Sequence, residues 1–84
     1  MRKPSVHLNG TSRGALSEGY EDASRAVHRA LQALVECCPN ARDYYVQDDR
    51  AFEEARDEHQ ARIDKLQSVI RDIAELLHHV EGAP

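Results

Sequence analysis

The 84-residue sequence has no tryptophan, and its aromatic residues are three tyrosines and one phenylalanine. It also lacks any apolar run near the roughly 20 residues of a membrane-spanning helix, so we expect no membrane association. The opening residues MRKPSVHLNG include two basic side chains but lack the apolar core of about seven or more residues that a signal peptide has. The sequence therefore predicts a cytoplasmic protein.

Cysteine is scarce as well, and the two cysteines, Cys37 and Cys38, are adjacent. An adjacent pair can close only a strained small ring, so no disulfide framework is expected. The pair also lacks zinc-ligand spacing, and the nearest histidine, His28, belongs to preceding turns. We predict neither a metal nor another cofactor. A chain this short buries a modest core, so self-association is the remaining way to stabilise it.

Acidic residues outnumber basic residues only slightly. The formal net charge is −4, with 31% of residues charged and both signs mixed along the chain. A protein that grips a nucleic-acid backbone needs a basic face, so nucleic acid is not an expected partner. The negative charge is also too weak for a mimic of DNA.

Helical periodicity dominates what is present. From residue 12, apolar residues recur at steps of three and four, the spacing that lines one helix face. They are Leu16, Tyr20, Ala23, Val27, Ala30, Leu31, Leu34, Val35 and Cys38. We predict a helix over about 12–38, capped by Thr11, Ser12 or Ser17, with Ser12 favoured. Pro39 ends it, because the residue before a proline is disfavoured in the α region.

A second helix is predicted over about 49–81, with Asp48 or Asp49 as its cap and Gly82 and Pro84 as its stop. One apolar stripe contains Phe52, Ala55, His59, Leu66, Val69, Ile73, Leu76 and Val80. A second stripe, made of Ile63, Ile70 and Leu77, lies beside it. Packing two helices together buries only one stripe on each. An apolar face as wide as two stripes therefore predicts that another copy of the chain packs against the exposed part.

The predicted fold is all-α: one domain over 1–84, forming an antiparallel two-helix hairpin that associates into a helical-bundle homo-oligomer. Its loop spans about 39–48. Residues 1–11 form an extended N-terminal arm, in which Val6 and Leu8 alternate with polar residues; the arm either lies on a helix or adds a single strand. A dimer would make a four-helix bundle, and trimers or larger rings are alternatives.

A first candidate ligand site is the polar segment HLNGTSR. Its members are His7, Asn9, Gly10, Thr11, Ser12 and Arg13. Free backbone N–H groups at a helix start, hydroxyls, an amide and a guanidinium together suit an anion, phosphate above all. The simpler interpretation is that Asn-Gly makes a turn and a hydroxyl caps the helix.

The loop segment RDYY supplies the second candidate set: Arg42, Asp43, Tyr44 and Tyr45. Arginine can hold a phosphate or carboxylate through two hydrogen bonds, and a tyrosine ring can stack on a base. In the simpler interpretation, one tyrosine plugs the open end of the hairpin while Arg42 pairs with Asp43.

The two candidate sites lie at opposite ends of a hairpin, the first of them near His78 and His79. One chain therefore cannot combine them, but an antiparallel dimer brings the loop of each subunit to the arm of the other. His59 is expected in the core or at an interface. The acidic residues Asp48, Asp49, Glu53, Glu54, Asp57 and Glu58 are expected to be a solvated face, with a basic partner protein as the minority reading. No catalytic constellation stands out, so we do not expect an enzyme.

The motifs HLNGTS, PNARDYYVQ and FEEARDEHQARIDKL resemble a group of short proteins encoded by bacteriophages and prophages. The resemblance extends from Val6 to about Leu77. It implies a phage protein acting in an infected bacterial host, and some small oligomeric phage proteins sequester a nucleotide second messenger of host immunity without catalysis. The expectation is such an anti-defence sponge. The alternatives are a helical module that blocks a host defence protein and a structural or regulatory phage accessory protein.

Overall fold

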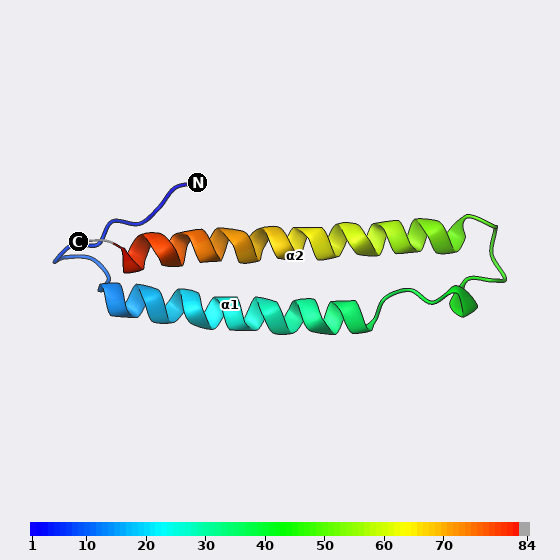
Figure 1. Cartoon of the computed structure of the whole chain (residues 1–84), viewed down its shortest axis with the longest axis horizontal. Coiled ribbons are helices and arrows are strands. Elements are labelled where there is room, and N and C mark those ends of the chain that lie inside the picture. The colour runs from blue at the N-terminus through cyan, green and yellow to red at the C-terminus, as the bar shows by residue number, and fades with distance from the viewer. Residues whose placement is uncertain (83–84) are drawn as a thin grey trace.

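The structure is a computed structural model that describes residues 1–82. It contains helix α1 (Arg13–Glu36), a short 3-10 helix η1 (Ala41–Asp43) and helix α2 (Ala51–Glu81). Figure 1 shows α1 and α2 side by side and antiparallel, in a rod measuring 61 × 20 × 17 Å. Residues 1–82 include no strand. The predicted all-α fold and helical hairpin are thus confirmed.

Helix α1 begins where the capping pattern placed it. Ser12 is the N-cap, and its side chain accepts a hydrogen bond of 3.1 Å from the backbone N–H of Ala15. The helix ends at Glu36, two residues before the predicted end, with Cys37 as the C-cap. Pro39 has no N–H to donate to the Val35 carbonyl, which instead accepts from Cys38. The proline thus stops the helix earlier than expected.

The start of α2 corrects a prediction. Its N-cap is Arg50, which makes no capping hydrogen bond through its side chain, so neither Asp48 nor Asp49 caps the helix. The Asp48 carboxylate instead accepts from the backbone N–H of Arg50 at 2.9 Å, and its carbonyl accepts from Ala51 at 3.1 Å. Asp48 therefore closes the turn before the helix, the local bonding that aspartate favours. At the other end Gly82 is the C-cap, and Pro84 lies outside the described residues.

The seam between the helices is thin. Within the described residues, Ile73 and Val80 are the only buried apolar side chains, and His59 is the one buried polar side chain. The half-buried residues of α2 include all of the predicted second stripe: Ile63, Ile70 and Leu77. From His59 to Val80 the seam advances by alternate steps of four and three, as paired helices require, and so takes residues from both stripes. Val69 of the first stripe stays 42% exposed.

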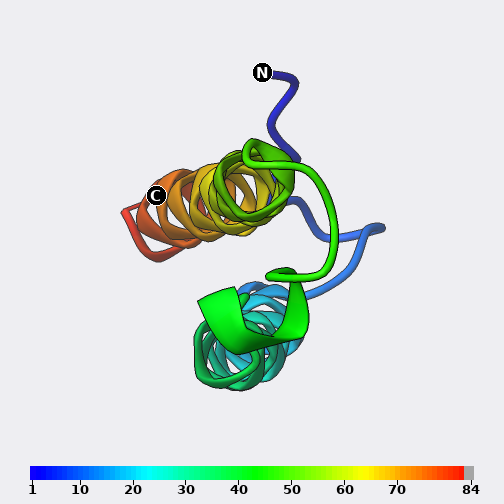
Figure 2. The same ribbon diagram turned by 90° about the vertical axis from the view of Figure 1, so that its right-hand side faces the viewer.

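Residues 1–12 precede α1 and run back along the last turns of α2. Lys3 Nζ lies 3.4 Å from a Glu75 carboxylate oxygen, and His79 Nε2 donates to the Pro4 carbonyl at 2.8 Å. Figure 2 shows the N-terminus beyond α2, on the side away from α1, and the rest of the segment passing along one flank of the rod to the start of α1. Of the two predicted forms for Val6 and Leu8, a strand is not what residues 1–12 adopt.

Candidate functional site

The loop between the helices is held by its own short-range bonds. Asn40 is the N-cap of η1, and its side-chain oxygen accepts from the backbone N–H of Arg42 at 3.0 Å. Arg42 and Asp43 are both exposed, and no ion pair joins them in the described chain. The loop thus presents the Arg42 guanidinium to solvent rather than using it to hold the turn.

The two loop tyrosines have different surroundings. Tyr44 is half-buried against Phe52, with ring centroids 6.3 Å apart and planes tilted by 47°. Phe52 in turn lies under the Arg56 guanidinium, whose central carbon is 5.7 Å from the ring centroid. Tyr45 is 81% exposed. One tyrosine therefore plugs the end of the hairpin, as the simpler interpretation expected, while the other is free for contact.

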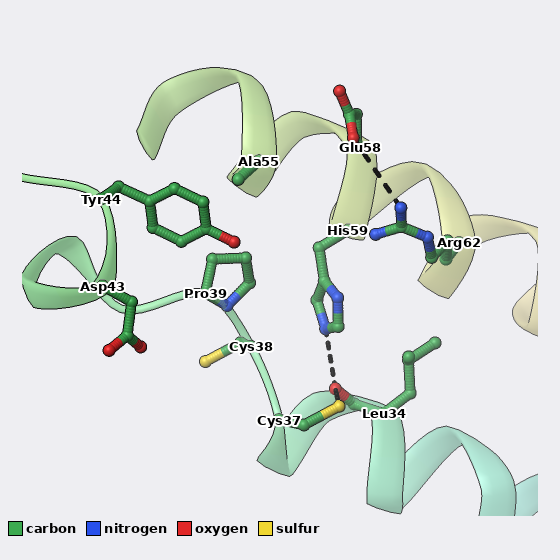
Figure 3. Close-up of a pocket in the computed structure, with 10 residues that line it drawn as sticks. All are labelled: Leu34, Cys37, Cys38, Pro39, Asp43, Tyr44, Ala55, Glu58, His59 and Arg62. Atoms are coloured by element: carbon green, nitrogen blue, oxygen red, sulfur yellow. Dashed lines mark hydrogen bonds and ion pairs between the residues drawn. The ribbon is translucent and has the colours of Figure 1, made fainter. Parts of the chain in front are cut away.

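A hollow of about 450 Å³ lies between this loop and the adjoining helix ends. Figure 3 shows the ten residues that line it: Leu34, Cys37, Cys38, Pro39, Asp43, Tyr44, Ala55, Glu58, His59 and Arg62. Of the predicted site residues, only Asp43 and Tyr44 are among them. Sequence reasoning missed Arg62 and the cysteines because α1, the loop and α2 each supply part of the wall. The one available signal was a histidine in an apolar stripe.

His59 is the most buried of these residues, with 6% of its surface exposed. Its Nε2 lies 2.7 Å from the Leu34 carbonyl, and because a carbonyl only accepts, this nitrogen carries the hydrogen. Leu34 is in the last turn of α1, where the Cys38 N–H goes to Val35 instead. His59 thus satisfies a helix-end carbonyl that has no backbone donor, and Cys37 Sγ donates to the same oxygen at 3.3 Å.

Arg62 supplies the cation of the hollow. Its nearest partner is the Glu58 carboxylate, 3.8 Å away and one helical turn earlier (Figure 3), and both side chains are more than half exposed. An exposed pair at this separation contributes at most a few tenths of a kcal/mol, about 0.3–0.5. The guanidinium can therefore exchange this carboxylate for a better-placed anion at little cost.

The N-terminal segment forms a second hollow, of about 440 Å³, at the other end of the rod. It is lined by Val6, His7, Leu8, Gly10, Ser12 and Arg13. The predicted residues Asn9 and Thr11 are exposed and do not line it. The backbone N–H of Gly10 donates to the His7 carbonyl at 3.1 Å, and a side-chain carbon on Gly10 would come within 2.7 Å of His7 Nε2. Glycine thus lets the histidine ring fold over the turn.

The two hollows are separated by most of the rod. Figure 1 shows the loop at one end of the hairpin and the start of α1, beside the end of α2, at the other. His79 does meet the N-terminal segment, through Pro4, while His78 is exposed. The structure therefore brings His7, Gly10, Ser12 and Arg13 together at one hollow, and Asp43 and Tyr44 at the other, but does not join the two sets.

Other kinds of site are not found in the described part of the chain. Residues 1–82 contain no group of three or more histidine, cysteine or acidic side chains placed to hold a metal ion. None of the helices there is both long and apolar enough to span a membrane. In comparisons with known proteins, no family model, no curated protein and no solved structure matches the chain.

Proposed function

We propose that this protein is a non-catalytic phage-type anti-defence factor that sequesters a phosphate-bearing nucleotide at sites between its subunits. The observation that carries the proposal is the placement of two exposed, ligand-type polar segments at opposite ends of one rod. A ligand that uses both segments requires a second chain, antiparallel to the first. The anti-defence role rests on the resemblance to short phage proteins.

The loop end would hold the ring and one anionic group of the nucleotide. Tyr45 is exposed and can stack on a base, while Tyr44 is already fixed against Phe52. Arg42 and Arg62 offer two guanidinium groups that no strong ion pair occupies within residues 1–82. The hollow that Arg62 lines has a volume within the range of about 300–1,000 Å³ usual for small-molecule sites.

The N-terminal segment of the partner subunit would hold the remaining phosphate. Backbone N–H groups at the start of α1 and the Arg13 guanidinium both favour negative charge there. Ser12 already uses its oxygen to cap Ala15, so its hydroxyl hydrogen is what remains for a ligand. Asn9 and Thr11, which are exposed beside the hollow, would reach a ligand that extends out of it.

A thermal-shift panel tests the proposal, with cyclic dinucleotides, cyclic trinucleotides and adenosine diphosphate ribose derivatives as probes. A nucleotide at one hundred times its dissociation constant stabilises the fold by about 2.7 kcal/mol. That corresponds to a rise in Tm of roughly 10–20 °C for a chain of this size. The Arg42→Ala variant should lose the shift. The matched control is Arg29→Ala, which removes another exposed guanidinium, from α1 instead of the loop. No shift with any probe, for a folded protein, refutes nucleotide capture.

A second candidate function is a module that occupies a host defence protein. It is favoured by the exposed carboxylates in the first turns of α2, Glu53, Glu54, Asp57 and Glu58. Among these turns the one arginine, Arg56, lies over Phe52. A basic protein surface is the partner that such a cluster fits. Loss of host-factor binding in Glu53→Lys with Asp57→Lys, but not in Arg42→Ala, would favour this function over the first.

A further inference from the structure

Small and apolar side chains follow one another along one side of the hairpin. The residues of α1 on this side recur at steps of four, three and four, and all are exposed. With about 3.6 residues per turn, they form one continuous line beside the seam. On α2 the matching flank has two larger apolar residues. We call these six residues the alanine face: Gly19, Ala23, Ala26, Ala30, Val69 and Leu76.

The two halves of the alanine face lie at the same level and on the same side. The His59–Leu34 contact sets the register of the helices. Val69 lies ten residues after His59 on α2, and Ser24 lies ten residues before Leu34 on α1. Because the helices are antiparallel, Val69 and Ser24 are at the same height along the rod, and Ser24 falls between Ala23 and Ala26. On each helix, the residues of the face come one position before a residue of the seam. Because the helices are antiparallel, positions of this kind on α1 and on α2 lie on the same side of the rod. The six residues therefore form one surface.

The opposite side differs in its chemistry. There α1 presents His28, which is exposed and whose Nδ1 lies 2.7 Å from the carbonyl of the half-buried Ser24. On α2 the same side presents Gln60, which donates to Asp64 at 3.0 Å. These polar groups already have partners and need no cover. On the side of the alanine face, the N-terminal segment meets the flank of α2 near its last turns, where Pro4 bonds to His79, one turn beyond the half-buried Leu76. Val69 stays 42% exposed.

The exposed area of the chain exceeds what its mass predicts. It is 6376 Å² for 9.5 kDa, whereas a folded monomer of that mass exposes about 5,000 Å². Within residues 1–82 the two helices form a single layer with no third helix or sheet over it, which contributes to this excess. The excess amounts to more than the roughly 800 Å² that each partner buries in a stable interface of standard size. One side of the rod can therefore be covered by a partner of comparable length, and a second copy is such a partner.

We infer that the alanine face is where a second copy of the chain docks, with its helices antiparallel to the first. The inference rests on the proposed function, which requires the loop of one subunit beside the N-terminal segment of the other. Ala23 and Ala26 flank the middle of α1 (Arg13–Glu36), so a two-fold axis through them turns the face onto itself and exchanges the two ends of the rod. Small side chains also let helix axes approach to the short end of the usual distance range, about 8 Å.

The first test compares two arginine substitutions in α1. Ala26→Arg places a cation at the centre of the alanine face, and the two-fold axis brings it close to its own copy. Gln32→Arg adds the same charge at an exposed position outside the face. By light scattering, wild type and Gln32→Arg should have twice the chain mass. Ala26→Arg should raise the dissociation constant of the dimer at least about tenfold, because facing like charges are strongly disfavoured in an interface.

A cross-linking experiment covers the case in which Ala26→Arg fails to fold. In a Cys37→Ser, Cys38→Ser background, Ala26→Cys should form a disulfide-linked dimer on mild oxidation, at least ten times faster than Gln32→Cys. Equal rates at the two positions, a wild type that is monomeric while folded, or a dimer unchanged by Ala26→Arg would each overturn the inference.

The outcomes also separate this inference from the proposed function. A dimer that depends on Ala26 and cross-links through residue 26, but shows no nucleotide shift, supports the interface and refutes the sponge. If a nucleotide raises the Tm and the dimer is unchanged by Ala26→Arg, the nucleotide-sequestering function is supported and this interface is refuted.

Discussion

The hydrogen bond from His59 to the Leu34 carbonyl should account for a measurable part of the stability of the hairpin. Replacing His59 with leucine keeps an apolar side chain in the seam but removes the donor. The carbonyl then keeps only the thiol of Cys37, a weak donor at 3.3 Å. Leaving a buried acceptor unsatisfied costs about 1–3 kcal/mol, and this carbonyl is part-buried. Because the thiol and solvent at the helix end compensate in part, we expect a loss of about 1–2 kcal/mol, out of roughly 4–12 kcal/mol for 84 residues.

Urea denaturation followed by circular dichroism measures this loss, with all variants at one protein concentration so that association does not alter the comparison. The midpoint should fall with little change in slope, because the surface exposed on unfolding is nearly the same. His28→Leu is the matched control: that ring is exposed and bonds only within its own helix, so the change should stay within about 0.5 kcal/mol. A His59→Leu variant as stable as wild type, or more stable, would refute the capping role.

Two further pairs of variants test the ends of the rod. Ser12→Ala should destabilise the hairpin by about 1 kcal/mol through loss of the N-cap, measured by thermal denaturation, whereas Thr11→Ala leaves that cap intact. Equal effects of the two would contradict the capping assignment. Tyr44→Ala should lower the free energy of unfolding by about 1–2 kcal/mol, because it removes the half-buried ring that packs on Phe52. Tyr45→Ala, at an 81% exposed position, should change it by less than about 0.5 kcal/mol; a larger effect would show that the second ring also packs.

The fold followed from local patterns in the sequence. Steps of three and four between apolar residues predicted both helices. Ser12 indicated the start of α1, and Pro39 indicated its end. The start of α2 was harder to predict, because Asp48 could serve as a helix cap or as part of the preceding turn. Which flank of α2 meets α1 depends on the register, and the register depends on contacts such as His59 with Leu34 that no local pattern encodes.

The candidate site was predicted less completely than the fold. Asp43 and Tyr44 line the loop hollow as part of a conspicuous polar segment, but Arg62 and Glu58 resemble any exposed helix pair in the sequence. They become site residues only because the loop folds back beside them. Asn9 and Thr11 show the converse case, since their chemistry suits a ligand but they do not line the hollow.

The attachment of the N-terminal segment to α2 has a consequence for the order of folding events. His59 and Leu34 are 25 residues apart in the chain, whereas His79 and Pro4 are 75 apart. Because bringing distant residues together costs more chain entropy, the helices should zip together from the loop before the segment docks. Within residues 1–82, its polar contacts with α2 are one exposed ion pair and one hydrogen bond between a ring nitrogen and a carbonyl, and its apolar residues Pro4 and Val6 are only half-buried. The segment should therefore detach and return many times during the life of an intact hairpin, without disturbing the helices.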